Sequence, residues 1–381
     1  MPSITELETV TFTYEIDDVG YDGHGFNLVY EPGATMERSG SILRIHTDDG
    51  VVGETTGSVG EPTARYLLGK DPLDRERHWS EIRRYHRQRA TGDIGAVDVA
   101  LWDLAGKYAG LPVCQLLGKY RESLPCYAST PHGDENGGLD SPEAYADFAA
   151  ACLELGYPAF KIHGWGGSDA SRDTDREIAT VHAVGERVGE EMDLMLDPAC
   201  EYETFHDALT VGRACDEQEF MWYEDPYRDN GTSQHGHRQL RQRLDTPLLM
   251  TEHVQGLEPH TDVIAAEATD FVRGDLYHGI TGLMKVARVA EGFGLDVELH
   301  GPGPAMRQCM AAIRNTNYYE MGLVHPDWDH RLGPDVYEDY ADGLEAVDDR
   351  GHVPVPDGPG LGVSFDWDRI EATEVDRTSY A

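Results

Sequence analysis

The feature that most constrains the fold is a series of eight short apolar runs, each ending in polar residues. Stretches compatible with helices separate the runs, and the polar ends recur about 20 to 36 residues apart, the length of one strand, one helix and two loops. The runs are LPCYAS, AFKIH, MDLMLD, FMWYED, PLLMTEH, DFVRGD, LDVELH and NYYEMG. Nearly continuous apolar character is typical of strands covered on both faces. The series therefore predicts an α/β fold with a parallel (β/α) barrel.

A different pattern precedes these runs. Within residues 39–56 a DG turn joins two β-rich stretches, which is a strong hairpin signal, and residues 94–104 carry apolar side chains at helical spacing. We therefore expect an N-terminal α+β domain over residues 1–123 and the barrel over residues 124–340. The tail, residues 341–381, returns to strand and turn character and is expected to come back to the N-terminal domain.

A parallel barrel brings the carboxyl ends of all its strands to one mouth, where active sites are built. From the second run onward, ionisable residues occupy these ends. They are Lys161 with His163, Asp197, Glu224, Glu252, Asp275, His300 and Glu320. Although they are far apart in sequence, we expect them to meet in one cleft.

Three consecutive strand ends carry carboxylates. Asp197, Glu224 and Glu252 would repel one another strongly within a few ångströms unless a divalent cation neutralised them, and oxygen ligands with open positions suit Mg²⁺. Any one of these residues alone is as readily explained by a helix cap or by a pair with an arginine. Three in succession favour a magnesium site.

Other strand ends carry groups that transfer protons. Asp275 and His300 end neighbouring strands, and a carboxylate beside an imidazole fixes its tautomer and raises its basicity; a purely structural histidine is the alternative. Across the mouth, Lys161 and His163 are two residues apart and therefore point the same way. Lysine is scarce in this chain, which argues against a solvated strand end. Nearby cations would lower the pKa of either base toward neutrality, so either residue fits the role.

One further candidate lies outside the barrel. His24 belongs to the glycine-rich stretch YDGHGF. We interpret this stretch as a lid that brings His24 to the substrate at the barrel mouth, with an ordinary surface loop as the alternative.

Three parts of the sequence carry a resemblance to a known family. They are the helix AVDVALWDLAGK with GLPVCQLLG at the domain junction, the series of strand ends, and the closing PDGPGLG. With these motifs the chain resembles the enolase superfamily, and within it the mandelate racemase-like branch, over nearly its whole length. The resemblance implies an α+β capping domain, completed by the C-terminal tail, over a modified TIM barrel.

The resemblance also implies roles for the strand ends. It implies Mg²⁺ on the three carboxylates, proton transfer by the aspartate–histidine pair, and a hydrogen bond from Glu320 to the enolate oxygen. The chain departs from the family pattern at two positions: His163 stands where a second lysine is common, and Ala199 where an asparagine is common. These departures argue against mandelate racemisation itself and leave open whether Lys161 or His163 is the base.

The expected chemistry begins with a carboxylate substrate that bridges Mg²⁺. Loss of its α-proton gives an enediolate, and a β-hydroxyl that faces protonated His300 would leave as water, giving a 2-keto-3-deoxy acid. His163 and His24 are similar to features of acid-sugar dehydratases in this branch, which favours a hydro-lyase acting on a sugar acid. Racemisation or epimerisation and lactone cycloisomerisation are the enzymatic alternatives. Convergent polar strand ends disfavour a non-enzymatic acidic scaffold or binding module.

The charge of the chain bears on its partners and surroundings. Lys and Arg number 31 against 70 Asp and Glu, which gives a net charge of −39, while 40% of residues are hydrophobic. Nucleic acids and anionic membranes require cationic contacts and are not expected as partners. We interpret the acidic balance as halophilic, expect a cytoplasmic location because no signal-peptide pattern opens the sequence, and expect a homo-oligomer.

The net charge predicts a dependence of stability on salt. Salt screens charges over about 3 Å at 1 M but only over about 8 Å at 0.15 M, so lower salt exposes the repulsion between surface carboxylates. The melting temperature should therefore fall when salt is lowered from molar to physiological concentration. An unchanged melting temperature across that range, measured by circular dichroism, would contradict the halophilic interpretation.

Overall fold

Each of the eight apolar runs contains one strand of a parallel barrel. The computed structural model describes residues 2–23, 25, 27–87, 93–165, 174–328 and 332–381. The barrel strands are β4 (Ser123–Ser129), β5 (Ala159–Ile162), β6 (Asp193–Leu196), β7 (Trp222–Glu224), β8 (Leu248–Met250), β9 (Phe271–Gly274), β10 (Asp296–Leu299) and β11 (Tyr319–Gly322). Parallel ladders join them in the order β10-β9-β8-β7-β6-β5-β4-β11. The predicted fold class is therefore confirmed.

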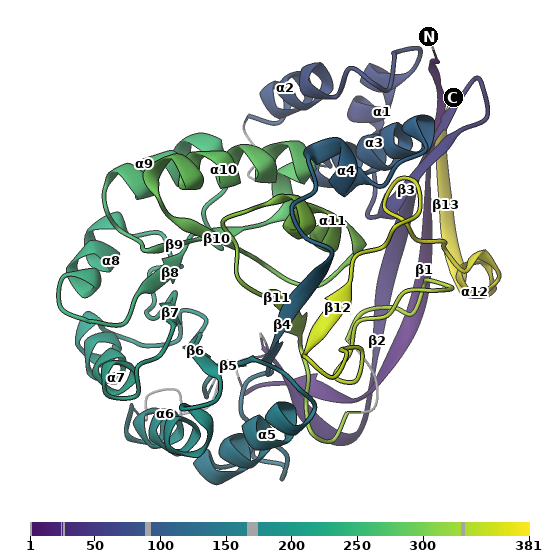
Figure 1. Ribbon diagram of the computed structural model, residues 1–381. Helices are drawn as coiled ribbons and strands as arrows, with labels where there is room; N and C mark the ends of the chain where they lie inside the picture. Colours follow the sequence, from purple (N-terminus) through teal and green to yellow (C-terminus); the bar gives the residue numbers. More distant parts are fainter. Residues whose placement is uncertain (1, 24, 26, 88–92, 166–173, 329–331) are drawn as a thin grey trace.

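Helices surround the barrel (Figure 1). They are α5 (Pro142–Glu154), α6 (Thr174–Val188), α7 (Phe205–Glu217), α8 (Gln234–Arg241), α9 (Leu257–Ala265), the 3-10 helix η2 (Leu276–His278), α10 (Gly279–Phe293) and α11 (Pro304–Ala312). Their inner faces pack with the outer faces of the strands in an extensive hydrophobic core. Between β10 and β11, where no ladder is formed in the described residues, the Val297 N–H donates to the Asn315 carbonyl at 2.8 Å.

The two ends of the chain share one sheet beside the barrel (Figure 1). β1 (Ile4–Tyr21), β2 (Leu28–Thr47) and β3 (Val52–Thr56) form an antiparallel sheet, and β13 (Glu374–Tyr380) pairs with the free edge of β1. The DG turn joins β2 to β3, as predicted. By contrast, β12 (His352–Pro354) pairs with the barrel strand β4. The C-terminal tail thus contacts both the barrel and the N-terminal sheet.

Helices cover the N-terminal sheet and lead into the barrel. They are α1 (Glu61–Leu67), α2 (Arg75–Tyr85), α3 (Ile94–Ala109) and α4 (Val113–Leu117), while α12 (Trp367–Ala372) precedes β13. Residues of α1, α2 and α3 share a second hydrophobic core with β1 and β2. Asp93 directly precedes α3, but its side chain does not cap the helix; the carboxylate instead accepts hydrogen bonds from Gly60 N (2.7 Å) and Thr63 Oγ1 (2.8 Å).

Side chains fill the barrel interior in layers. One apolar cluster inside the barrel contains Tyr127, Ala159, Met195, Trp222 and Leu249, with Phe271 and Tyr318 packed against it. Ala159, Trp222 and Phe271 come from the alternate strands β5, β7 and β9, and Tyr318 directly precedes β11, which is the usual composition of a layer in such barrels. Because strand side chains repeat every two residues, the residues two positions further along these four strands also face the barrel axis, nearer the mouth.

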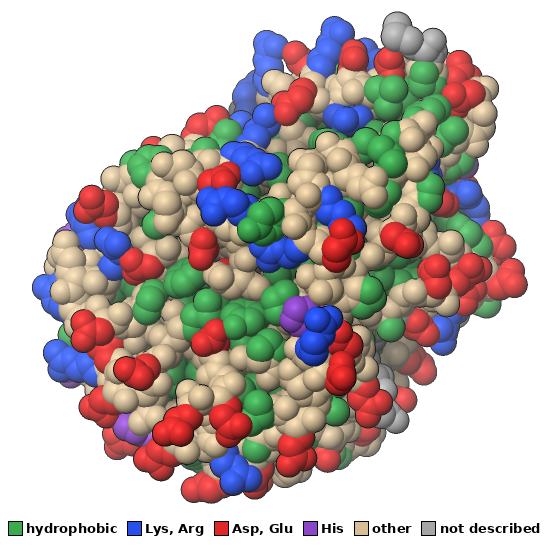
Figure 2. Space-filling view, in the orientation of Figure 1, with side chains coloured by type: hydrophobic (Ala, Val, Ile, Leu, Met, Phe, Trp, Pro, Cys, Tyr) green, Lys and Arg blue, Asp and Glu red, His purple; other side chains and the backbone are tan. Residues whose placement is uncertain are grey.

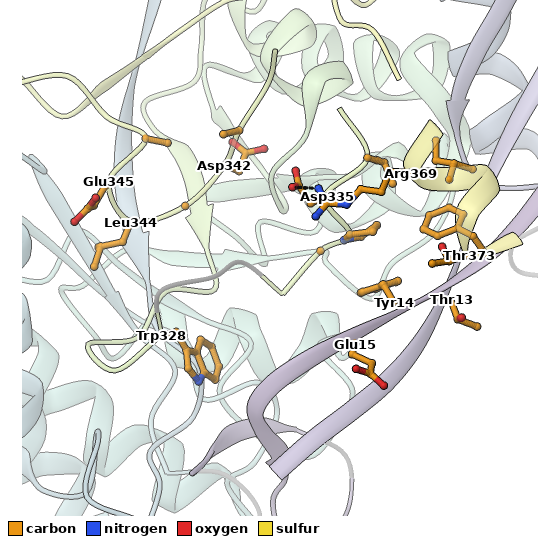
Figure 3. A pocket seen from close by; sticks show the side chains of 18 of the residues that line it. Thr13, Tyr14, Glu15, Trp328, Asp335, Asp342, Leu344, Glu345, Arg369 and Thr373 are labelled. Atoms are coloured by element: carbon orange, nitrogen blue, oxygen red, sulfur yellow. Dashed lines mark hydrogen bonds and ion pairs between the residues drawn. The ribbon is translucent and has the colours of Figure 1, made fainter. Parts of the chain in front are cut away.

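The surface of the protein is strongly acidic, as the composition requires. Figure 2 shows Asp and Glu side chains over much of one face, among fewer lysines and arginines. A groove of about 1140 Å³ lies between β1 and the segments that follow β11, and an ion pair between Arg369 and Asp335 borders it (Figure 3). None of the predicted site residues within the described part of the chain lines this groove, so it is separate from the barrel mouth. No helix in the described residues is long and apolar enough to cross a membrane.

Candidate active site

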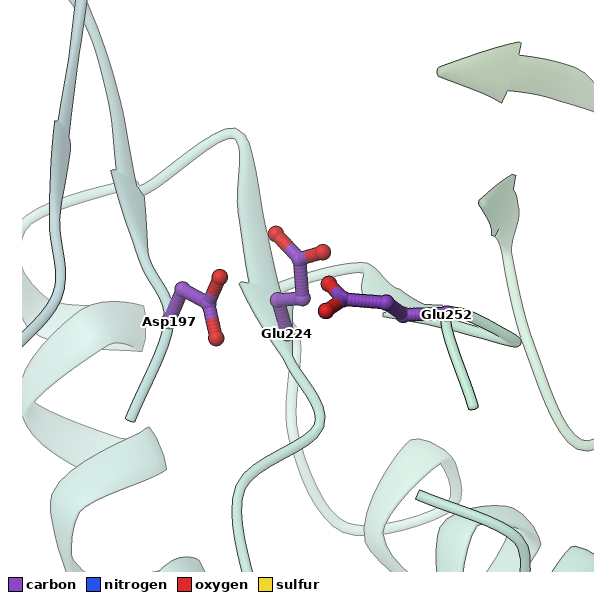
Figure 4. A group of neighbouring side chains, drawn as sticks. All are labelled: Asp197, Glu224 and Glu252. Carbon is purple, nitrogen blue, oxygen red and sulfur yellow. The ribbon is translucent and has the colours of Figure 1, made fainter. Parts of the chain in front are cut away.

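Three carboxylates meet at the barrel mouth, as the sequence predicts. Asp197, Glu224 and Glu252 lie at the ends of β6, β7 and β8, and one oxygen of each lies within 4.8 Å of the others (Figure 4). Burial raises the pKa of Glu224 to about 7; Arg273 and Lys161 favour the ionised form, while Asp197 opposes it. The cluster therefore carries closely spaced negative charge that the neighbouring cations, Arg273 and Lys161, compensate only in part.

Lys161 is a buried ammonium group. Its Nζ lies 2.9 Å from Asp197 Oδ2, 3.2 Å from Glu224 Oε2 and 3.1 Å from Glu320 Oε1, and its side chain is 1% exposed. Burial alone would lower the pKa of Lys161, but these carboxylates raise it well above its ordinary value. Contrary to the expectation from the sequence, the pKa of Lys161 is therefore not lowered toward neutrality, because the nearest charges are anions.

Arg273, inside the barrel on β9, was missed by the sequence analysis. Its side chain is fully buried, with Nε 3.0 Å from Glu224 Oε1 and Nη2 2.8 Å from Glu320 Oε2. Since Lys161 contacts the same two carboxylates, the four residues form a closed ring of alternating charge. They come from β5, β7, β9 and β11 and stack on the apolar layer beneath them. The available signal was an arginine inside the otherwise apolar run DFVRGD.

Glu320 is held as a carboxylate. Its Oε1 accepts a hydrogen bond from Ser129 Oγ at 3.0 Å, and its Oε2 accepts from the Gly301 N–H at 2.7 Å. Burial raises the pKa of Glu320, but the neighbouring cations hold it well below its usual value. An ionised carboxylate has no proton to donate to an enolate oxygen. The role implied by the resemblance stays a prediction, and this geometry does not favour it.

The Asp275–His300 pair lies at the mouth, at the ends of β9 and β10. His300 Nδ1 is 2.8 Å from Asp275 Oδ2, and Asp275 Oδ1 accepts from the Tyr277 N–H at 2.9 Å, which fixes the carboxylate. His300 Nε2 lies 3.6 Å from Glu252 Oε1 and thus faces the carboxylate cluster. Burial lowers the pKa of His300, but Glu252 and Asp275 raise it to about 9. The imidazole is therefore protonated at neutral pH.

His163 lies at the opposite end of the cluster. Its Nε2 is 3.1 Å from Asp197 Oδ2, and its Nδ1 is buried without a hydrogen-bond partner. The ring centroid of His132 lies 5.5 Å from that of His163. Burial lowers the pKa of His132 to about 3, so this histidine is neutral. The sequence analysis did not select His132, although it follows the first barrel run in STPH.

Irregular backbone turns Glu252 toward the cluster. Leu249 faces the barrel interior, so strict alternation would place Thr251 and His253 on that side. Thr251 instead has a φ of 97°, and its hydroxyl donates to the Arg273 carbonyl at 3.0 Å and accepts from the Arg273 N–H at 2.9 Å. Glu252 therefore joins the ligands while the side chain of His253 is 40% exposed. Backbone strain of this kind clusters at functional sites.

The long β1–β2 hairpin reaches the barrel loops. Asn27 Nδ2, near its tip, donates to Glu201 Oε1 at 3.2 Å in the segment after β6. Also close to the tip, the Asp18 carbonyl accepts a hydrogen bond from Trp328 Nε1 at 3.1 Å. His24 lies outside the described residues, so its contact with substrate stays a prediction.

The family comparisons agree with this geometry. Residues 144–369 match the family described as Enolase C-terminal domain-like, and residues 32–118 match the Mandelate racemase / muconate lactonizing enzyme, N-terminal domain. The chain belongs to the enolase superfamily. Its N-terminal match places it in the mandelate racemase-like branch of that superfamily.

Individual superfamily members resemble the chain over most of its length. The crystal structure of D-glucarate dehydratase from Agrobacterium tumefaciens, complexed with magnesium, has a TM-score of 0.89 and 31% identity, covering 98% of this chain and 99% of that chain. D-xylonate dehydratase of Haloferax volcanii is 27% identical over 373 residues, 88% of this chain and 85% of the relative. D-galactarolactone cycloisomerase of Agrobacterium fabrum is 27% identical over 359 residues, 87% of this chain and 90% of the relative.

The residues present fit a divalent cation such as the magnesium of the D-glucarate dehydratase structure. All three candidate ligands are carboxylates, and oxygen donors are what Mg²⁺ prefers. Glu224 Oε1 receives no hydrogen bond, although Arg273 Nε lies 3.0 Å away, so this buried oxygen is available as a ligand. Asp197, Glu224 and Glu252 would hold the cation.

The cluster predicts that Glu252→Gln weakens Mg²⁺ binding. The substitution keeps the shape of the side chain but removes one ligand charge, and we expect at least the ~10-fold loss of affinity that even residues supporting a ligand cause. Isothermal titration calorimetry would measure it. Glu298→Gln is the matched control: Glu298 is buried on β10, two strands away from β8, and accepts a hydrogen bond from Asn317 (Nδ2 to Oε1, 2.6 Å), so binding should be unchanged. Equal affinities for Glu252→Gln and the unchanged chain would contradict the metal site.

Proposed function

We propose that the chain is a Mg²⁺-dependent hydro-lyase that dehydrates a sugar acid to a 2-keto-3-deoxy acid. Membership of the enolase superfamily supports proton abstraction next to a carboxylate, and the similar proteins named as D-xylonate and D-glucarate dehydratases support dehydration of a sugar acid. When bound, Mg²⁺ would polarise the substrate carboxylate and lower the pKa of the adjacent C–H group.

One observation carries the proposal: imidazoles stand at both ends of the carboxylate cluster. His163 approaches Asp197, with 3.1 Å from Nε2 to Oδ2, and His300 approaches Glu252, with 3.6 Å from Nε2 to Oε1. A substrate bound at the cluster therefore has one imidazole on each side. Such a site can remove a proton from one face and deliver a proton to the other.

The protonation states assign the two roles. His300 is protonated, with its pKa raised to about 9, and acts as the acid that converts the departing hydroxyl at C3 into water. Lys161 is committed as an ammonium group to three carboxylates and is not free to accept a proton. His163 is therefore the base that takes the proton from C2. Elimination leaves an enol, which loses its hydroxyl proton and gains one at C3 to become the 2-keto-3-deoxy acid.

Lactone cycloisomerisation is the second candidate. The similarity to D-galactarolactone cycloisomerase favours it. It would use the same proton abstraction, but the leaving group would be a ring oxygen of the substrate. Screening pentonates, hexonates, aldarates and their lactones for keto-acid formation distinguishes the two, because only dehydration releases a keto acid directly from the open-chain hydroxy acid.

Replacing His300 tests the reaction type. His300→Asn cannot deliver a proton, so keto-acid formation should fall by ~10²–10⁴-fold, the contribution usual for a general acid. The variant should still exchange the substrate C2 proton in D₂O, because the base lies on the other side of the cluster. Nuclear magnetic resonance would measure both keto-acid formation and exchange of the C2 proton. Unimpaired keto-acid formation would eliminate this mechanism.

Replacing His163 tests the base. His163→Phe should lose both C2 exchange and dehydration by ~10²–10⁴-fold, because no proton leaves C2. Magnesium binding, measured by calorimetry, should be retained and shows that the site is intact. Full exchange in His163→Phe would mean that another group is the base.

The raised pKa of His300 predicts a pH limit. The acid must carry its proton, so on the alkaline side kcat should fall as the pH rises through the pKa of His300, at or below pH 9 because a bound cation also repels the proton. Asp275→Asn removes a group that raises this pKa, and the alkaline limb of the kcat–pH profile should move to lower pH. If the alkaline limb of Asp275→Asn stays where it is in the unchanged chain, a group other than His300 sets that limb.

A further inference from the structure

We propose that Arg273 is a permanent counter-ion of the metal-ligand cluster: it keeps Glu224 in place in the metal-free chain and limits the affinity for a divalent cation. The inference rests on the metal site proposed above and adds a positioning residue that is neither a ligand nor a proton-transfer group. Arginine stays protonated throughout the pH range in which proteins fold, so its effect on the cluster is constant.

Arg273 contacts the cluster from the barrel interior. Its Nε lies 3.0 Å from Glu224 Oε1 and 4.0 Å from Glu252 Oε2, so it approaches two of the three proposed ligands. The other guanidinium nitrogens are fixed: Nη2 lies 2.8 Å from Glu320 Oε2, and Nη1 donates to the Tyr127 hydroxyl at 3.1 Å. Because both Nη atoms are hydrogen-bonded and the side chain is fully buried, Arg273 cannot turn away when a cation binds.

The charges around the cluster do not cancel by themselves. Four carboxylates, those of the three proposed ligands and Glu320, face two permanent cations, Lys161 and Arg273. With the imidazoles left aside, two negative charges remain, and one divalent cation neutralises them. Without Arg273 the excess would be three buried negative charges, which is strongly unfavourable in a medium of low dielectric constant.

This arrangement has two consequences for metal binding. In the metal-free chain, Arg273 offsets the repulsion that would otherwise separate Glu224 from its neighbours, so the ligands are in position before a cation arrives. In the loaded chain, the same positive charge repels the cation, so the affinity is lower than the three carboxylates alone would give.

The experiment is thermal unfolding of Arg273→Met in EDTA and in saturating MgCl₂, with calorimetry of Mg²⁺ binding. We expect a large fall in melting temperature in EDTA and recovery of most of it in Mg²⁺, so that the rise caused by Mg²⁺ exceeds that of the unchanged chain. The affinity for Mg²⁺ should increase by about tenfold or more, because a repelling charge has been removed. Arg273→Lys keeps the charge and should keep the Mg²⁺ response of the unchanged chain.

Arg307 supplies the matched control. It is also buried, at 3% exposure, but it lies on α11 and donates from Nη2 to the Ala341 carbonyl at 2.7 Å and to Asp342 Oδ1 at 2.5 Å. Arg307→Met loses a buried ion pair away from the cluster. Its melting temperature should therefore fall equally in EDTA and in Mg²⁺.

Each result decides the inference. Equal losses of melting temperature for Arg273→Met in both media, or weaker Mg²⁺ binding, would overturn the counter-ion role and leave the metal site standing. The absence of any Mg²⁺ response in the unchanged chain would overturn the metal site and the inference together. If Arg273→Met folds in neither medium, Arg273→Met/Glu320→Gln removes one charge of each sign and should regain the normal Mg²⁺ response; a weaker response would reject the role.

Discussion

The ring of alternating charge inside the barrel is the interaction on which the rest of the site depends. Lys161, Glu224, Arg273 and Glu320 occupy a layer that in such barrels is usually filled by branched apolar side chains. Each carboxylate lies between two cations, and each cation between two carboxylates. Because breaking one member leaves an uncompensated buried charge, which destabilises a protein by about 3–5 kcal/mol, the ring fixes the four strand ends relative to one another.

The sequence predicted the barrel and its mouth because both follow from periodicity. Apolar runs at regular spacing define the strands, and each run contains one strand in the structure. Asp197, Glu224 and Glu252 come together because parallel strands end at the same edge. The position of the mouth follows once all strands are taken to be parallel, and the helix-compatible stretches between the apolar runs predict that they are.

The parts that escaped prediction depend on contacts between strands or on backbone that breaks the alternation. In the sequence, Arg273 only interrupts an apolar run; its role depends on Glu224 of β7 and Glu320 of β11, which the fold brings to it. Thr251, with its positive φ, reverses the side of the barrel to which Glu252 points, and a threonine gives no local sign of that conformation. The charge state of Lys161 likewise depends on three carboxylates from three other strands, so the sequence left its role open.

The pairing of β13 with β1 makes the first and last strands of the chain neighbours in one sheet. The hairpin that β1 forms with β2 brings Asn27 to the barrel loops, where its amide donates to Glu201 Oε1 at 3.2 Å. The segment beside the mouth is therefore supported by a sheet whose neighbouring strands lie far apart in sequence. A substitution that weakens the pairing of β13 with β1 would also weaken the support of this hairpin.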